Sequence, residues 1–182
     1  MPVTVPKFIG ARVRRKEDPR LITGRATYTD DIVLPRMAYV KLVRSTQAHA
    51  KLTKVDVAAA KKMPGVIAVV TGEDIKDRIA PLPVAHKIPD LKVPAHTALA
   101  MGEVRHVGEA IVAIVADSAA QATDAAEHVV VDYEPLPAVT DVEQAAAGAP
   151  FVHADLGTNV AFTFPFKAGD PDAQLAKAPV KI

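Results

Sequence analysis

The fold is decided by residues 110–116, which read Ala110-Ile111-Val112-Ala113-Ile114-Val115-Ala116. An uninterrupted apolar run of this length, rich in β-branched residues, is typical of a buried strand. Gly108, just before the run, predicts a hairpin or a bulge. Just after it, Ser118-Ala119-Ala120-Gln121 has the form of a capping box and predicts a helix over residues 118–128. Because residues 129–133 again suit a strand, this part of the chain is predicted to be a β-α-β unit.

A second unit of the same kind is predicted upstream. Residues 37–45 place apolar side chains mainly on alternate positions, as in a strand with one covered face. Asp56 offers an N-cap to a helix over residues 57–63, which Pro64-Gly65 would end, and residues 66–70 suit a short buried strand. Both units need a crossover that lays an alanine-bearing helix on a sheet, and such crossovers are right-handed.

Less regular segments surround these units. Residues 1–36 are polar, broken by glycine and proline, and predicted to form an extended N-terminal arm. Residues 76–100 contain recurring prolines and predict a long surface loop, which is usually functional or part of an interface. Thr140-Asp141-Val142-Glu143 forms another capping box, ahead of a short helix closed by Gly148. We therefore expect an arm over 1–36, a compact domain over 37–150 and a linker over 151–182, in the α+β or α/β class.

The composition excludes several kinds of function. The chain has 182 residues, 49% of them hydrophobic and 24% charged, which is typical of a globular domain. A net charge of +1 and only 4% aromatic residues argue against a nucleic-acid surface. No cysteine is present, which excludes disulfides, thiolate-bound iron–sulfur clusters and a thiol nucleophile on this chain. The beginning lacks a long apolar stretch and no run could span a bilayer, so we expect a cytoplasmic protein.

Candidate chemical groups are present, but their spacing specifies no reaction. The basic run 12–16 favours a solvated arm or a subunit-docking strip over a nucleic-acid patch, because aromatic residues are missing and two acids follow it. Gly102 and Gly108 fit turns better than a phosphate loop. The six histidines lack metal-ligand spacing, although folding could gather two or three of them: His49, His86, His96, His106, His128 and His153. From the residues alone we assign no catalytic, cofactor-binding or metal-binding residue.

Five ordered segments carry a resemblance to a known family: Ile9–Ile32, Val43–Leu52, Met63–Ile75, Val107–Ala116 and Val131–Val139. They resemble the corresponding stretches of molybdenum-hydroxylase large subunits, the family of xanthine dehydrogenase, aldehyde oxidase and the carbon monoxide dehydrogenase large chain. Ala110 departs from the proline that is common in the carbon monoxide dehydrogenase branch. The resemblance implies an α+β fold, the α/β hammerhead domain, with β-α-β units, an N-terminal arm and a long proline-rich loop.

The resemblance also implies a function for the larger assembly. Such an enzyme oxidises an aldehyde, an N-heterocycle or carbon monoxide, with water as the oxygen source. Its molybdenum is held by molybdopterin, expected here in the cytosine dinucleotide form, in a region beyond residue 182, and [2Fe–2S] clusters and FAD lie on partner chains. The catalytic and cofactor-contacting residues of the family lie in that later region, so none is transferred to this chain, which alone is expected to be inactive. A free-standing hammerhead interaction module without a catalytic role is the alternative.

Overall fold

The computed structural model describes residues 8, 10–85, 88–166 and 168–180. It divides into two units, Met1–Met37 and Ala38–Ile182. Among its described residues, the first unit contains one helical turn, α1 (Asp18–Ile22), and one 3-10 turn, η1 (Thr29–Asp31), and the other described residues of this unit are irregular. The sequence predicted an arm without these two turns.

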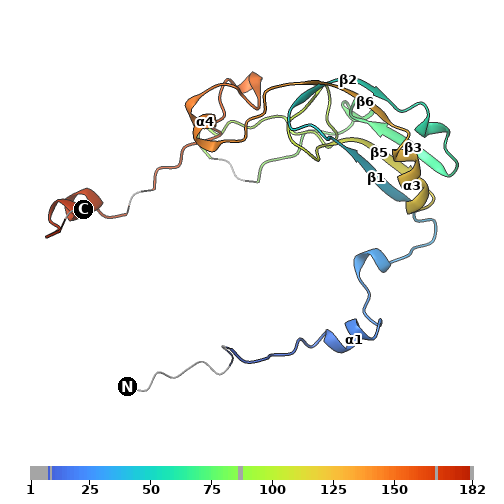
Figure 1. Ribbon diagram of the computed structural model, residues 1–182, viewed down its shortest axis with the longest axis horizontal. Coiled ribbons are helices and arrows are strands. Elements are labelled where there is room, and N and C mark those ends of the chain that lie inside the picture. The colour runs from blue at the N-terminus through green and yellow to red at the C-terminus, as the bar shows by residue number, and fades with distance from the viewer. Residues whose placement is uncertain (1–7, 9, 86–87, 167, 181–182) are drawn as a thin grey trace. The chain divides into compact units, whose positions relative to one another are not determined.

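The second unit contains the strands and the remaining helices (Figure 1). The elements are β1 (Tyr39–Arg44), β2 (Ala50–Asp56), η2 (Ala60–Lys62), β3 (Val66–Thr71), α2 (Gly72–Ile75), β4 (Glu103–Val104), β5 (Ala110–Ala116), α3 (Ala119–Ala126), β6 (Val130–Pro135), α4 (Val142–Ala147), η3 (Ala154–Leu156) and α5 (Pro171–Ala176). None of the helices within the described residues is long and apolar enough to cross a membrane.

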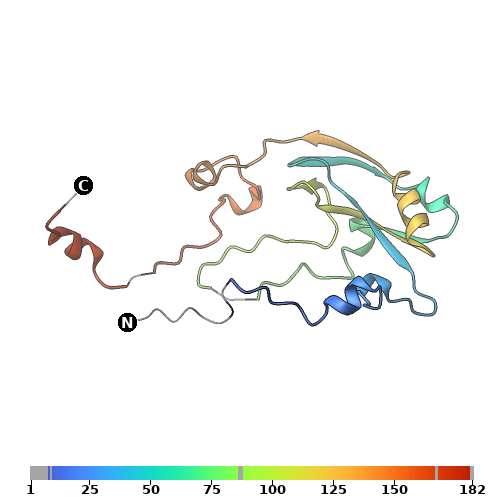
Figure 2. The same ribbon diagram turned by 60° about the horizontal axis from the view of Figure 1, so that its bottom comes forward.

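The strands form two three-stranded antiparallel sheets, in the orders β1-β5-β3 and β4-β2-β6. Successive residues of a strand point to opposite faces, and Ile111 and Val112 of β5 are both fully buried. β5 is therefore covered on both faces and paired on both edges, as its apolar run predicted. β4 and β6 are the edge strands of the second sheet, and Figure 2 shows β2 and β6 lying side by side.

Helix α3 packs against the first sheet through its small residues. Ala122 and Ala125 are buried, and the helix contacts β1, β5 and β3 (Figure 2). Ser118 caps it as predicted, because its Oγ accepts the N–H of Gln121 at 3.3 Å. The cap of α4 is one residue later than predicted, since Asp141, rather than Thr140, accepts the N–H of Gln144, at 2.8 Å.

The α+β class is confirmed, and so is the strand-helix-strand order of β5, α3 and β6. β1 and β3 lie parallel in one sheet with β5 between them, as expected for a crossover, but the second crossover expected within one sheet is wrong, because β6 joins the other sheet. Two details of the first predicted unit also differ. The sequence analysis missed strand β2, and the helix predicted over 57–63 is only the 3-10 turn η2, because Pro64 follows too closely for a longer helix.

Candidate functional site

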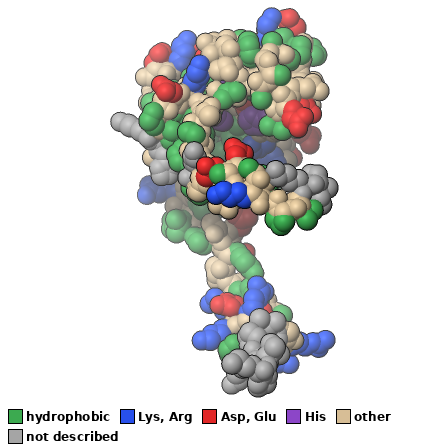
Figure 3. Space-filling view, turned by 90° about the vertical axis from the view of Figure 1, so that its left-hand side faces the viewer, with side chains coloured by type: hydrophobic (Ala, Val, Ile, Leu, Met, Phe, Trp, Pro, Cys, Tyr) green, Lys and Arg blue, Asp and Glu red, His purple; other side chains and the backbone are tan. Residues whose placement is uncertain are grey.

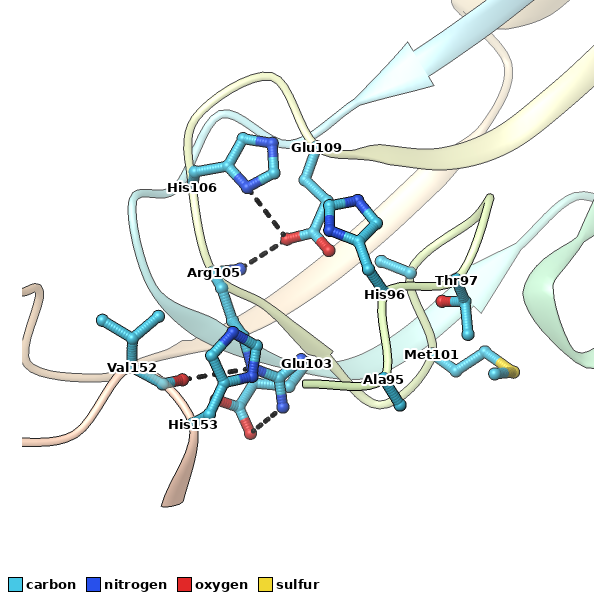
Figure 4. A pocket seen from close by; sticks show the side chains of 11 residues that line it. Ala95, His96, Thr97, Met101, Glu103, Arg105, His106, Glu109, Val152 and His153 are labelled. Carbon is cyan, nitrogen blue, oxygen red and sulfur yellow. Dashed lines mark hydrogen bonds and ion pairs between the residues drawn. The ribbon is translucent and has the colours of Figure 1, made fainter. Parts of the chain in front are cut away.

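A cavity of the second unit lies where β4 meets the loop before it and the segment after α4. Its volume is about 280 Å³, and histidine side chains lie in a hollow on this face (Figure 3). Figure 4 shows its polar groups turned toward one another. The lining residues are Ala95, His96, Thr97, Ala100, Met101, Glu103, Arg105, His106, Glu109, Val152 and His153.

A short strand and a tight turn position the charged residues of the cavity. Val104 is completely buried, so its neighbours Glu103 and Arg105 turn to the opposite side, toward the cavity. The turn after β4 is closed by the Glu109 carboxylate, which accepts the Arg105 N–H at 2.5 Å. Gly108 has a φ of 88°, a left-handed conformation that favours glycine at this turn. The turn glycine predicted from the sequence is therefore confirmed, although β4 and β5 lie in different sheets and form no hairpin.

Glu103 lies between two basic groups. Its Oε1 lies 2.6 Å from His49 Nε2, and its Oε2 lies 3.5 Å from the Arg105 guanidinium. The other ring nitrogen of His49, Nδ1, lies 2.7 Å from the carbonyl oxygen of Pro137. Arg105 Nε also donates to the carbonyl of Val152 at 3.1 Å. These contacts join four separate segments of the chain at one end of the second sheet.

His153 lies beside Arg105, on a segment that the side-chain amide of Asn159 holds in place. Burial lowers the pKa of His153 below its ordinary value of 6.5, and the nearby Arg105 charge lowers it further. Asn159 Oδ1 accepts the Val152 N–H at 2.9 Å, while its Nδ2 donates to the carbonyls of Ala145, Gly148 and Pro150 at 3.2, 3.0 and 2.9 Å. The lowered pKa favours the neutral form of His153, and the hydrogen bonds of Asn159 hold the segment on which His153 lies.

The structure brings together more histidines than their spacing in the sequence suggested. His96, His106 and His153 line the cavity, and His49 lines an adjoining cavity on the other side of Arg105. His128 lies elsewhere, just after α3, and His86 lies outside the described residues. The basic run 12–16 belongs to the first unit, where it is exposed and Arg15 pairs with Asp18 at 3.0 Å. Sequence reasoning missed Glu103, Arg105 and Glu109, whose one signal was their place between Gly102 and the apolar run of β5.

The donor set of the cavity does not fit a molybdenum centre. Among the described residues, histidines and carboxylates form no group of three that could hold a metal ion. Glu103 and Glu109 are already engaged by His49, Arg105 and His106, the last with Nδ1 3.6 Å from Glu109 Oε2. The contacts of these residues hold separate segments of the chain together.

Comparison with known proteins places these observations in a family context. Residues 23–137 match the family described as aldehyde oxidase and xanthine dehydrogenase, a/b hammerhead domain. The nicotine 6-hydroxylase large subunit of Paenarthrobacter nicotinovorans is 36% identical over 97% of this chain and 22% of its own length. The carbon monoxide dehydrogenase large chain of Afipia carboxidovorans is 35% identical over 95% of this chain and 18% of its own length. The chain thus spans about a fifth of the length of these curated relatives.

The solved structures agree. The crystal structure of quinoline 2-oxidoreductase from Pseudomonas putida 86 superposes with a TM-score of 0.81 and 36% identity, over 92% of this chain and 21% of that chain. At this identity the likeness extends beyond the fold to common ancestry.

Proposed function

The chain belongs to the aldehyde oxidase and xanthine dehydrogenase hammerhead family, and on that premise we propose that it is the N-terminal structural part of the large subunit of a molybdenum hydroxylase. One observation carries the proposal: similarity covers 97% of this chain but only 22% of the nicotine 6-hydroxylase large subunit. The hammerhead match accounts for residues 23–137 of the shared part.

The proposal includes the reaction and the cofactors of the complete enzyme. The enzyme oxidises an aldehyde, an N-heterocycle or carbon monoxide in the cytoplasm, with water as the oxygen source. Molybdopterin, in its cytosine dinucleotide form, is held by the remainder of the large subunit, and [2Fe–2S] clusters and FAD lie on partner chains. Residues 1–36 are the arm, residues 37–150 the hammerhead domain, and residues 151–182 the linker and the start of the molybdopterin-binding region.

This chain then contributes packing surface and no catalytic, cofactor-binding or metal-binding residue. Exposed apolar side chains on the tail and the loop support this role. Phe164 and Phe166 are 70% and 84% exposed, and Leu82 of the loop is 56% exposed. Burying such side chains stabilises an interface by about 25 cal/mol per Å² of apolar surface before the costs of association. We infer that these residues pack against the molybdopterin-binding remainder.

Co-expression tests the proposal. A tagged copy of this chain is produced together with the molybdopterin-binding remainder of a large subunit of this family, and the purified material is analysed for molybdenum and for both polypeptides. We expect a complex that contains molybdenum and both polypeptides, whereas the chain alone should be free of molybdenum and inactive. Stoichiometric molybdenum on the isolated chain, or turnover of an aldehyde by it, would refute the proposal.

A pair of variants distinguishes a specific interface from non-specific hydrophobic association. Phe164→Ser should weaken the association, because the side chain lies on the proposed packing surface. Val142→Ser is the matched control, since Val142 is 82% exposed on α4. If both variants leave the complex intact, the tail does not form the interface. If the wild-type chain purifies alone beside the expressed cofactor region, the free-standing interaction module is the better description.

A further inference from the structure

His49 makes two contacts that a neutral histidine cannot satisfy together. Nδ1 lies 2.7 Å from the carbonyl oxygen of Pro137, and Nε2 lies 2.6 Å from Oε1 of Glu103. A carbonyl oxygen and a carboxylate oxygen accept hydrogen bonds and donate none. Neutral imidazole carries one N–H, so its other nitrogen would present a lone pair to an acceptor at bonding distance. Only an imidazolium donates from both nitrogens.

The remaining possibility is that the shared proton sits on Glu103. Arg105 argues against it, because its guanidinium lies 3.5 Å from Oε2 of Glu103 and favours the ionised carboxylate. The His49 side chain is 9% exposed, so water has little access to replace either partner. The short distances also suit charge-assisted hydrogen bonds.

We propose that His49 is a charged strut, meaning an imidazolium held between the Glu103 carboxylate and the Pro137 carbonyl. When His49 loses a proton, the junction of β4, β2 and the segment after β6 opens. His49 immediately precedes β2, Glu103 belongs to β4, and Pro137 follows β6. The strut therefore ties the three strands of the second sheet at one end. This inference does not depend on the proposed enzyme function.

The structure indicates which element should be released first. β4 pairs with β2 at only two positions, Ala50 with Val104 and Lys51 with Glu103, whereas β6 pairs with β2 along most of its length. The backbone also holds the segment after β6, because the Leu136 N–H donates to the His49 carbonyl at 2.9 Å. Loss of the proton should therefore loosen β4 and, with it, the wall of the cavity.

The surroundings of His49 set the direction of the pH effect. The charged or titratable groups that face it are Glu103 from β4 and Arg105 and His106 from the following turn, whereas residues 138–140 contribute only uncharged side chains. The junction is held by a proton on His49, so it is closed at low pH and opens as pH rises through the loss of that proton. Stability from the strut is thus present on the acid side and lost on the alkaline side.

The test is an NMR titration of ¹⁵N-labelled histidine side chains in the full chain. Exposed His128 is the internal reference in the same sample. We expect His49 to carry protons on both ring nitrogens at pH 7 and to lose one of them at a higher pH than His128 does. The backbone amide of Val104 should shift with the same midpoint. A neutral His49 at pH 7, or a midpoint equal to that of His128, would overturn the proposal.

A designed variant sharpens the test. In Glu103→Gln the side-chain amide can donate to Nε2, so a neutral His49 with its proton on Nδ1 satisfies both partners. We expect His49 in this variant to be neutral at pH 7. Glu134→Gln is the matched control, because Glu134 pairs with Lys51 at 3.2 Å, whereas the carboxylate that contacts His49 is that of Glu103. No change in Glu103→Gln relative to the control would contradict the strut, and if that variant fails to fold, the wild-type titration decides.

Discussion

Replacing Asn159 offers a sharp test of how the cavity wall is held. The side-chain amide accepts one backbone N–H and faces three carbonyls, and this arrangement requires its NH₂ group on the carbonyl side. Asn159→Ala removes about three net hydrogen bonds of about 0.5–1.5 kcal/mol each. Because the site is only partly buried, we expect a local cost of about 2 kcal/mol.

Asn159→Asp should be worse than Asn159→Ala at neutral pH, although aspartate has almost the same shape. It keeps the acceptor for the Val152 N–H but turns a carboxylate toward three carbonyl oxygens. The damage should lessen as pH falls through the carboxyl titration near about 4, because a protonated carboxyl regains one donor. At neutral pH the local stability should therefore be lowest in Asn159→Asp, higher in Asn159→Ala and highest in the wild type. The difference between the two variants should become smaller in acid.

Hydrogen exchange measured by mass spectrometry can resolve this local effect. Peptides covering residues 149–160 should exchange about 30-fold faster in Asn159→Ala, as about 2 kcal/mol of lost local stability implies, whereas peptides from β5 should change little. Thr158→Ala is the control, since its hydroxyl accepts a single N–H, from Val160 at 3.1 Å. Equal exchange in wild type and both Asn159 variants, or less damage from aspartate than from alanine, would refute the reasoning.

Three further predictions concern the core, a tight contact and pH. Ile114→Ala should lower the free energy of unfolding in urea by about 2–5 kcal/mol, because Ile114 is fully buried, whereas Val40→Ala, at a site 62% exposed, should cost far less. Gly72→Ala should lower the free energy of unfolding by about 1–3 kcal/mol in the same assay, since a Cβ there would lie 2.9 Å from the Ala100 carbonyl oxygen. An unchanged free energy of unfolding would mean that the backbone at Ala100 shifts to make room for the Cβ. Burial lowers the pKa of His153, so the folded state binds fewer protons than the unfolded chain, and stability should fall as pH drops below about 6.5. Thermal unfolding of wild type and His153→Gln across pH 5–8 checks this, because the variant should lack that part of the acid loss.

The central strand and its helix could be predicted because their signals are local. The run 110–116 is apolar throughout, and Ser118 with Gln121 marks the start of α3. β2 could not be predicted in the same way, because its pairing with β6 shifts register between Leu52 and Lys54. A bulge of this kind interrupts the two-residue alternation by which a half-covered strand is recognised.

The candidate site was beyond sequence reasoning for a different reason. His49 and Glu103 are 54 residues apart, and Arg105 and Val152 are 47 apart, so their contacts exist only after the sheets have formed. Periodicity reports the face on which a side chain lies and says nothing of partners on other elements. The family, by contrast, could be identified from ordered motifs along the chain, and the match over residues 23–137 confirms it.

The open side of β6 bears on how these molecules behave when concentrated. Asp132 and Glu134 are exposed on this strand, two residues apart. Should two molecules meet there as antiparallel neighbours, carboxylates from each would be forced close together, and like charges facing one another oppose pairing. Asp132 and Glu134 therefore oppose the association of two molecules through the edge of β6.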